Sequence, residues 1–263
     1  MTANIKETNV FSFAEKFKKS SFVSLVSVFA AFNVICDLLL SSPIPFSGGV
    51  WFSWVFMITP LSGVLLGPLA GFLASFIGVM VGHSIVFRGS EEFLFTLGAP
   101  IGAMVAGFLF RARWREVLVY YLVLLGAYFA APVAWQLPWW GMWDVFLAFI
   151  FLLTIIIAMR KCKNIWNSEA KTKLLHILAL CTFVGLEADV LFRIFILIPC
   201  QTYQSIYGLD AARMVDLLTL QSFWVAGAVE TPIKAALSTI ITTIIGPPII
   251  MAAKKVGLPL VKS

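Results

Sequence analysis

Residues 21–40, SFVSLVSVFAAFNVICDLLL, form an apolar run in which Asp37 is the one charged side chain. At a rise of about 1.5 Å per residue, a helix of this length spans about 30 Å, the thickness of the hydrocarbon core of a bilayer. The whole chain has the same character, since 60% of its 263 residues are hydrophobic, 12% are charged and the mean hydropathy is +0.96. Such a composition excludes a soluble globular domain and predicts a polytopic membrane protein.

Further apolar runs of span length follow the first one. We predict an all-α bundle of about eight transmembrane helices that forms a single domain over residues 21–253. The predicted spans are residues 21–40, 50–66, 68–87, 93–110, 117–134, 143–159, 174–198 and 222–252.

Lysine and arginine residues are concentrated in every second loop of this arrangement. Because cytoplasmic loops hold the excess of these residues, we predict a multi-pass protein of the cell membrane with both termini in the cytoplasm. The basic residues on the predicted inner side are Lys16, Lys18, Lys19, Arg111, Arg113, Arg115, Arg160, Lys161, Lys163, Lys254 and Lys255. The net charge of +6 follows from this topology, so it does not imply a nucleic-acid partner.

Two cytoplasmic segments flank the membrane domain, residues 1–20 and residues 254–263. In the first, Phe11, Ala14 and Phe17 are spaced along one side among lysines. This segment is predicted either as an interfacial helix that contacts membrane lipid or as a flexible tail.

Polar side chains interrupt the apolar spans mainly near the predicted outer face. In the first span, Ala30, Asn33 and Asp37 recur at intervals of three and four residues and therefore share one helical face, which we expect to point into the bundle. Ionisable residues inside a membrane are commonly functional. The candidate solute-binding residues within the spans are Asn33, Asp37, His83, Glu187, Asp189, Arg193, Glu230 and Lys234.

Two pairs of these residues have the spacing of helical ion pairs. Asp189 and Arg193 are four residues apart, and so are Glu230 and Lys234, with Pro232 between them. The pairs can either hold a solute or only keep two helices in register. Because the acidic residues outnumber the basic ones, a cationic or amine-bearing ligand is favoured.

Tryptophans are frequent in the loop after residue 134. Trp135 and Trp139 could stack on a flat ligand, or they could belong to an interfacial aromatic belt. His83 does not indicate a metal site, because the second histidine, His176, lies at the opposite end of its span. We therefore predict neither a metal ion nor a cofactor.

Cysteine usage leaves two alternatives. Cys36 and Cys200 both lie near the predicted outer face and could form a disulfide, but four free thiols are favoured. The other two are Cys162 on the predicted inner side and Cys181 within the membrane.

Small residues form stripes on several spans. On the first span, Ser20, Ser24, Ser27 and Ala31 recur on the face opposite Asn33, so that face is either a packing surface within the bundle or a docking surface for another membrane protein. On the third and fourth spans, glycine and alanine at similar spacing predict close helix packing, with Gly67 and Pro68 forming a tight turn.

Three stretches resemble the substrate-binding S component of energy-coupling factor transporters: residues 22–39 (FVSLVSVFAAFNVICDLL), residues 65–82 (LLGPLAGFLASFIGVMVG) and residues 230–249 (ETPIKAALSTIITTIIGPPI). The resemblance implies a six-span core, extended here by an extra pair of spans, that captures a vitamin-like micronutrient from outside. It also implies docking on a transmembrane T component driven by two ATPase subunits. In that family an AxxxA face of the first helix contacts the T component, and the matching residues are Ser27 and Ala31, with Ser24 beside them.

Two other function classes remain as alternatives. In a stand-alone secondary transporter, Glu187 and Glu230 would carry protons or sodium ions. In an intramembrane enzyme acting on a lipid or isoprenoid, Glu187, Asp189 and Glu230 would act as acid, base or metal ligands. The chain has no GxxxxGK[ST], GxSxG or HExxH motif and no DxxxD repeat, so we expect a binding protein that is not itself an enzyme.

Overall fold

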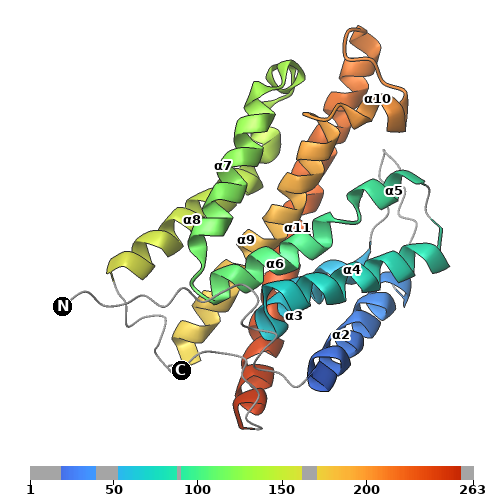
Figure 1. Ribbon diagram of the computed structural model, residues 1–263. Coiled ribbons are helices and arrows are strands. Elements are labelled where there is room, and N and C mark those ends of the chain that lie inside the picture. The colour runs from blue at the N-terminus through green and yellow to red at the C-terminus, as the bar shows by residue number, and fades with distance from the viewer. Residues whose placement is uncertain (1–18, 40–52, 88–89, 162–170, 256–263) are drawn as a thin grey trace.

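The computed structural model describes residues 19–39, 53–87, 90–161 and 171–255, and every regular element in these ranges is helical (Figure 1). Most of the predicted terminal segments, 1–20 and 254–263, lie outside the described residues, and so does Cys162. The elements in chain order are α2 (Lys19–Leu39), η1 (Trp54–Met57), α3 (Thr59–Leu66), α4 (Pro68–Ile85), α5 (Ser90–Phe95), α6 (Gly98–Phe110), α7 (Trp114–Ala130), η2 (Pro132–Gln136), η3 (Trp139–Met142), α8 (Trp143–Lys161), α9 (Lys171–Leu197), α10 (Thr202–Tyr207) and α11 (Met214–Lys255).

The predicted all-helical membrane architecture is confirmed. Six helical segments of the described chain are long and apolar enough to cross a membrane, and they are Ser20–Leu38, Pro68–Ile85, Phe93–Phe110, Trp139–Arg160, Leu174–Leu197 and Met214–Ala252. The predicted spans 50–66 and 117–134 correspond to shorter helical segments, Trp54–Leu66 and the 17-residue α7. At 42 residues α11 is about 63 Å long, so it extends well beyond the hydrocarbon core.

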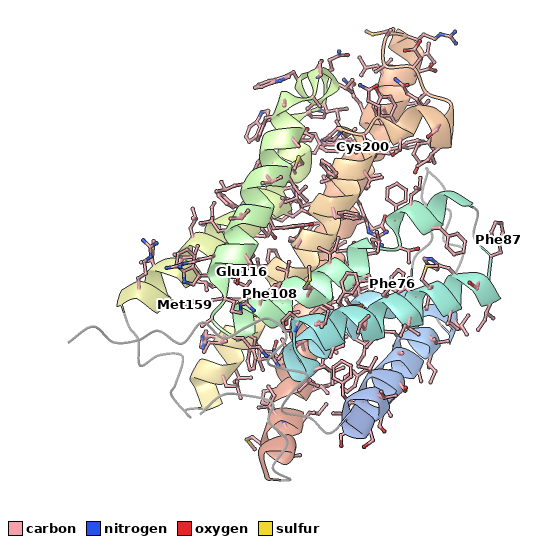
Figure 2. The ribbon with its side chains drawn as sticks, in the orientation of Figure 1. Phe76, Phe87, Phe108, Glu116, Met159 and Cys200 are labelled. Carbon is pink, nitrogen blue, oxygen red and sulfur yellow. The ribbon has the colours of Figure 1, made fainter. Side chains whose placement is uncertain are left out.

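Helices α9 and α11 lie side by side through the middle of the bundle, with α7 and α8 on one side of them and α2 to α6 on the other (Figure 1). The outer surface is apolar, as lipid contact requires. Phe87, for example, points away from the helices and is 69% exposed (Figure 2), and large aliphatic side chains are exposed along α2, α7, α8 and α11. Such an exterior would be an aggregation surface in water, but it is suited to a bilayer.

Glycines allow the helices on the α2 side to pack backbone to backbone, as predicted. A Cβ added to Gly63 of α3 would lie 1.8 Å from the carbonyl oxygen of Ala103 in α6, and one added to Gly71 of α4 would lie 2.5 Å from the Cα of Gly63. Gly67 joins α3 to α4 with a φ of 102°, a conformation that favours glycine, and Pro68 follows as the first residue of α4. The predicted Gly67-Pro68 turn is therefore present.

Arg111 ties the ends of two helices together. Its Nη1 donates to the carbonyl oxygens of Gly63 at 3.4 Å and Val64 at 3.3 Å in α3, and of Gly107 at 3.3 Å in α6. Cations are favourable at helix C-termini because the terminal carbonyls carry partial negative charge. Burial lowers the pKa of Arg111 to about 10, so the side chain remains charged at neutral pH.

The described cysteines do not form the disulfide that was one of the two alternatives. Cys36, Cys181 and Cys200 are all free thiols.

Candidate functional site

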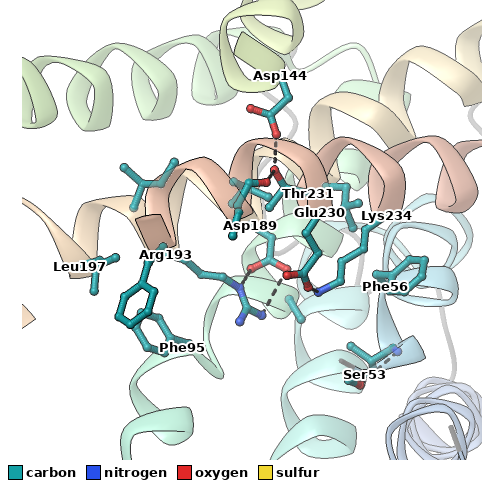
Figure 3. Close-up of a pocket in the computed structure, with 18 of the residues that line it drawn as sticks. Ser53, Phe56, Phe95, Asp144, Asp189, Arg193, Leu197, Glu230, Thr231 and Lys234 are labelled. Carbon is teal, nitrogen blue, oxygen red and sulfur yellow. Dashed lines mark hydrogen bonds and ion pairs between the residues drawn. The ribbon is translucent and has the colours of Figure 1, made fainter. Parts of the chain in front are cut away.

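A cavity of about 240 Å³ opens between α9 and α11, with walls from α2, α4, α5 and the start of α8 (Figure 3). It brings together six of the predicted solute-binding residues, namely Asp37, His83, Asp189, Arg193, Glu230 and Lys234. Asp37 and His83 lie near the helix ends that the charge pattern predicts to be external, whereas Glu230 and Lys234 lie in the middle of α11. The sequence-based expectation that they share one site therefore has a structural basis.

One face of α9 forms a wall of the cavity. Its lining residues recur at helical spacing and are Leu186, Asp189, Val190, Arg193, Ile194 and Leu197. The Arg193 Nε donates to Asp189 Oδ1 at 2.6 Å, so the predicted ion pair forms. Asp189 approaches α6 closely, because a Cβ added to Gly98 would lie 1.9 Å from its Oδ1. The glycine at the start of α6 thus makes room for a charged pair.

The facing wall comes from α11, where Glu230 and Lys234 form the second predicted ion pair and extend towards Asp189 and Arg193 (Figure 3). Pro232 lies inside this helix and cannot donate a hydrogen bond to the carbonyl of Ala228. Trp143 of α8 takes this place, since its indole Nε1 donates to Ala228 O at 3.0 Å. The carbonyl of Ala228, which Pro232 leaves without a donor from its own helix, therefore has a partner in Trp143. This hydrogen bond fixes α8 against α11 beside the cavity.

A polar cluster at the ends of α2 and α4 forms a third wall. Ser53 donates to Asp37 Oδ1 at 2.5 Å, and His83 Nε2 lies 3.8 Å from Asp37 Oδ2. The other ring nitrogen of His83 is 3.1 Å from the hydroxyl of Thr96. Gly82 of α4 allows this approach, because a Cβ there would lie 2.2 Å from Asp37 Oδ2. Asp37 and Asn33 are both fully buried, which confirms that their face of α2 points inward.

Sequence reasoning missed Asp144, which lines the cavity from the first turn of α8. Its Oδ2 accepts a hydrogen bond from the Thr231 hydroxyl on α11, and its Oδ1 accepts one from the backbone N–H of Val145 at 2.9 Å. An acidic residue at the start of a predicted span is usual near a helix N-terminus. The available signal was that Asp144 falls next to Trp143 in an otherwise apolar run, at a predicted outer end.

An aromatic side chain that was not predicted completes the wall near Asp144. Trp224 of α11 lines the cavity, its ring is parallel to that of Tyr128 at 5.7 Å between centroids, and its indole N–H donates to Pro138 O at 3.0 Å. Gly141 is required beside it, because a Cβ there would lie 2.2 Å from the Trp224 Nε1. The indole is therefore held rigidly, with its polar atom already satisfied.

Four predicted solute-binding residues lie outside this lining. Asn33 is buried between α2 and α4, where it donates to Phe29 O at 2.8 Å. Glu187 is fully buried at the edge of the α9 face, near Asp144. Trp135 and Trp139 are each 74% exposed, which agrees with the alternative of an interfacial belt.

The predicted docking residues Ser24, Ser27 and Ala31 lie on the outward side of α2, and all three are exposed. Among the described residues no helix covers this face, so it is not the internal packing surface that was the other alternative. The polar and the small-residue faces of α2 thus point in opposite directions, as their spacing predicts.

No protein-family model matches the chain, and no similar curated protein or solved structure was found. The site must therefore be interpreted from its own chemistry.

Proposed function

We propose that this protein is a membrane-embedded substrate-capture subunit of an energy-coupling factor type of uptake transporter. It binds a small, charged organic solute of the vitamin-like class from the outer side of the cell membrane. The cavity carries this proposal, because it gathers two ion pairs and two further acidic residues from separate helices in an otherwise apolar bundle. Charged groups inside a membrane are costly to maintain, and a solute that exploits them accounts for their convergence.

The partner in this proposal is a transmembrane T component with two ATPase subunits, since the chain itself has no nucleotide-binding motif. The outward face of α2 with Ser24, Ser27 and Ala31 is the docking surface, because small side chains allow another helix to approach closely. Both termini lie in the cytoplasm in this arrangement. The segment α7–α8 is the pair of spans added to a six-span core.

The first test is native mass spectrometry of the protein purified gently from membranes, which should reveal a retained small molecule. Glu230→Gln and Asp37→Asn should reduce its retention, because each removes a charge from the cavity wall. The matched variants Ser27→Leu and Ala31→Leu should keep the solute but prevent co-purification with the T component. Equal loss of solute in both sets of variants would reject this division of α2 into two faces.

A stand-alone secondary transporter is the second candidate, and one observation favours it. Glu187 is fully buried beside Asp144, and paired carboxyl groups can carry a proton or a sodium ion. Once mass spectrometry has identified the solute, a transport assay decides between the two candidates. Proteoliposomes containing this chain alone should accumulate that solute in response to a proton or sodium gradient only if it is a secondary transporter.

A further inference from the structure

The acidic side chains that line the cavity differ in whether a basic residue accompanies them. Asp189 is paired with Arg193, Glu230 is paired with Lys234, and the imidazole of His83 lies 3.8 Å from Asp37.

Asp144 is the exception. No ion pair of Asp144 with any other described residue is present. Its hydrogen-bond partners carry no positive charge, and they are the Thr231 hydroxyl, the backbone N–H of Val145 and the adjacent carboxyl of Glu187. Asp144 is only 1% exposed, and a buried carboxylate without a cation costs several kcal/mol of free energy. Among the acidic residues of the cavity lining, Asp144 is therefore the one without a basic side chain beside it.

The carboxylate of Asp144 retains capacity for a further donor. A carboxylate offers about four lone-pair sites. The bonds from Thr231 and Val145 occupy one on each oxygen, and a third from the Glu187 carboxyl still leaves one site for a ligand. The Thr231 and Val145 bonds also fix the orientation of the group, because they hold it from α11 and from α8. A ligand N–H that reaches Asp144 thus meets an acceptor that needs little reorganisation.

Space for a ligand lies next to this acceptor. Gly227 lines the cavity one helical turn before Thr231, and a Cβ added there would meet no atom within 4 Å. Trp224 lines the same part of the cavity with its N–H already bonded to Pro138, so its ring can contact an apolar group without leaving a polar atom unsatisfied. Open space, an aromatic wall and an acid without a basic partner adjoin one another.

We propose that the cavity binds an organic cation that carries N–H groups, an ammonium or amidinium attached to a flat apolar body, with its N–H groups on Asp144 and its body along Trp224. This inference rests on the proposed capture function and names the chemical class of its solute. A quaternary ammonium ion is not favoured, because the remaining lone-pair site of Asp144 requires a hydrogen-bond donor.

The test uses three small probes that share a benzyl group, on the full-length protein in detergent. Benzylamine supplies an N–H cation, benzyl alcohol is its neutral analogue, and benzyltrimethylammonium is a cation without N–H groups. Calorimetry should show that wild type binds benzylamine at least about tenfold more tightly than either analogue, as expected for a charge-assisted hydrogen bond. Asp144→Asn should lose this preference and leave benzyl alcohol binding unchanged.

Glu116→Gln is the matched control, since it removes an acid that has a basic partner, Arg113, but lies outside the cavity lining, in the first turn of α7. It should keep the preference for benzylamine within about threefold. The inference is overturned if Asp144→Asn retains the preference, if Glu116→Gln abolishes it, or if benzylamine does not bind the wild type at all. None of these results would contradict the proposed capture of a solute, because that proposal is tested separately, by the molecule that co-purifies with the protein.

Discussion

Replacing Gly98 with alanine tests whether the charged wall of α9 depends on close packing with α6. The added Cβ would lie 1.9 Å from Asp189 Oδ1 and 3.1 Å from Arg193 Nε, whereas ordinary contact begins at 3.4 Å. The carboxylate cannot move away freely, because it is bonded to Arg193 at 2.6 Å and its side chain is only 12% exposed. Either the ion pair or the position of α6 must change.

The magnitude follows from the packing. Inserting one methyl group into a filled space costs about 1–3 kcal/mol of unfolding free energy. Gly126 in the middle of α7 provides a control, because a Cβ there would meet no atom within 4 Å. Gly126→Ala should instead gain up to about 1 kcal/mol from helix propensity. The two variants should therefore differ by roughly 1–4 kcal/mol although the chemical change is identical.

The assay is thermal unfolding of both variants in the same detergent, followed by the fluorescence of the nine tryptophans. A difference of about 2–4 °C is expected for each kcal/mol in a chain of this size. Gly98→Ala should also retain less of the co-purified solute, because Asp189 lines the cavity. Equal unfolding temperatures for Gly98→Ala and Gly126→Ala would refute the inferred contact.

Three further predictions concern separate parts of the fold. Trp143→Phe should lower the unfolding free energy by about 1–2 kcal/mol, because the carbonyl that Pro232 leaves free loses its donor. In a Pro232→Ala background this loss should largely vanish, and a double-mutant cycle of unfolding free energies measures the coupling. Arg111→Gln should destabilise the chain by about 1–3 kcal/mol in thermal unfolding, since a neutral amide replaces the charged donor to the ends of α3 and α6. Trp135→Ala and Trp139→Ala should leave solute retention in mass spectrometry unchanged, because both side chains face outward; reduced retention would place them in the site.

The polar faces of individual helices could be predicted from the sequence to the residue. Helical periodicity relates residues three or four positions apart, so it predicts an inward face with Asn33 and Asp37 and an ion pair of Asp189 with Arg193, and both are present. The same periodicity separates Glu187 from Asp189. The two residues are two positions apart, which is a rotation of about 200° around the helix, so Glu187 lies outside the cavity lining although it is equally acidic.

Composition alone determined that the chain is a helical membrane bundle, and periodicity determined which residues share a face on each helix. These two properties depend only on local helix geometry and on the polarity of the bilayer. The tertiary structure decided which faces meet. It brought Asp144 and Trp224 into the cavity and left Trp135 and Trp139 on the surface. Those outcomes depend on the crossing of helices far apart in the chain, where glycines such as Gly82 and Gly98 permit contacts that no local pattern encodes.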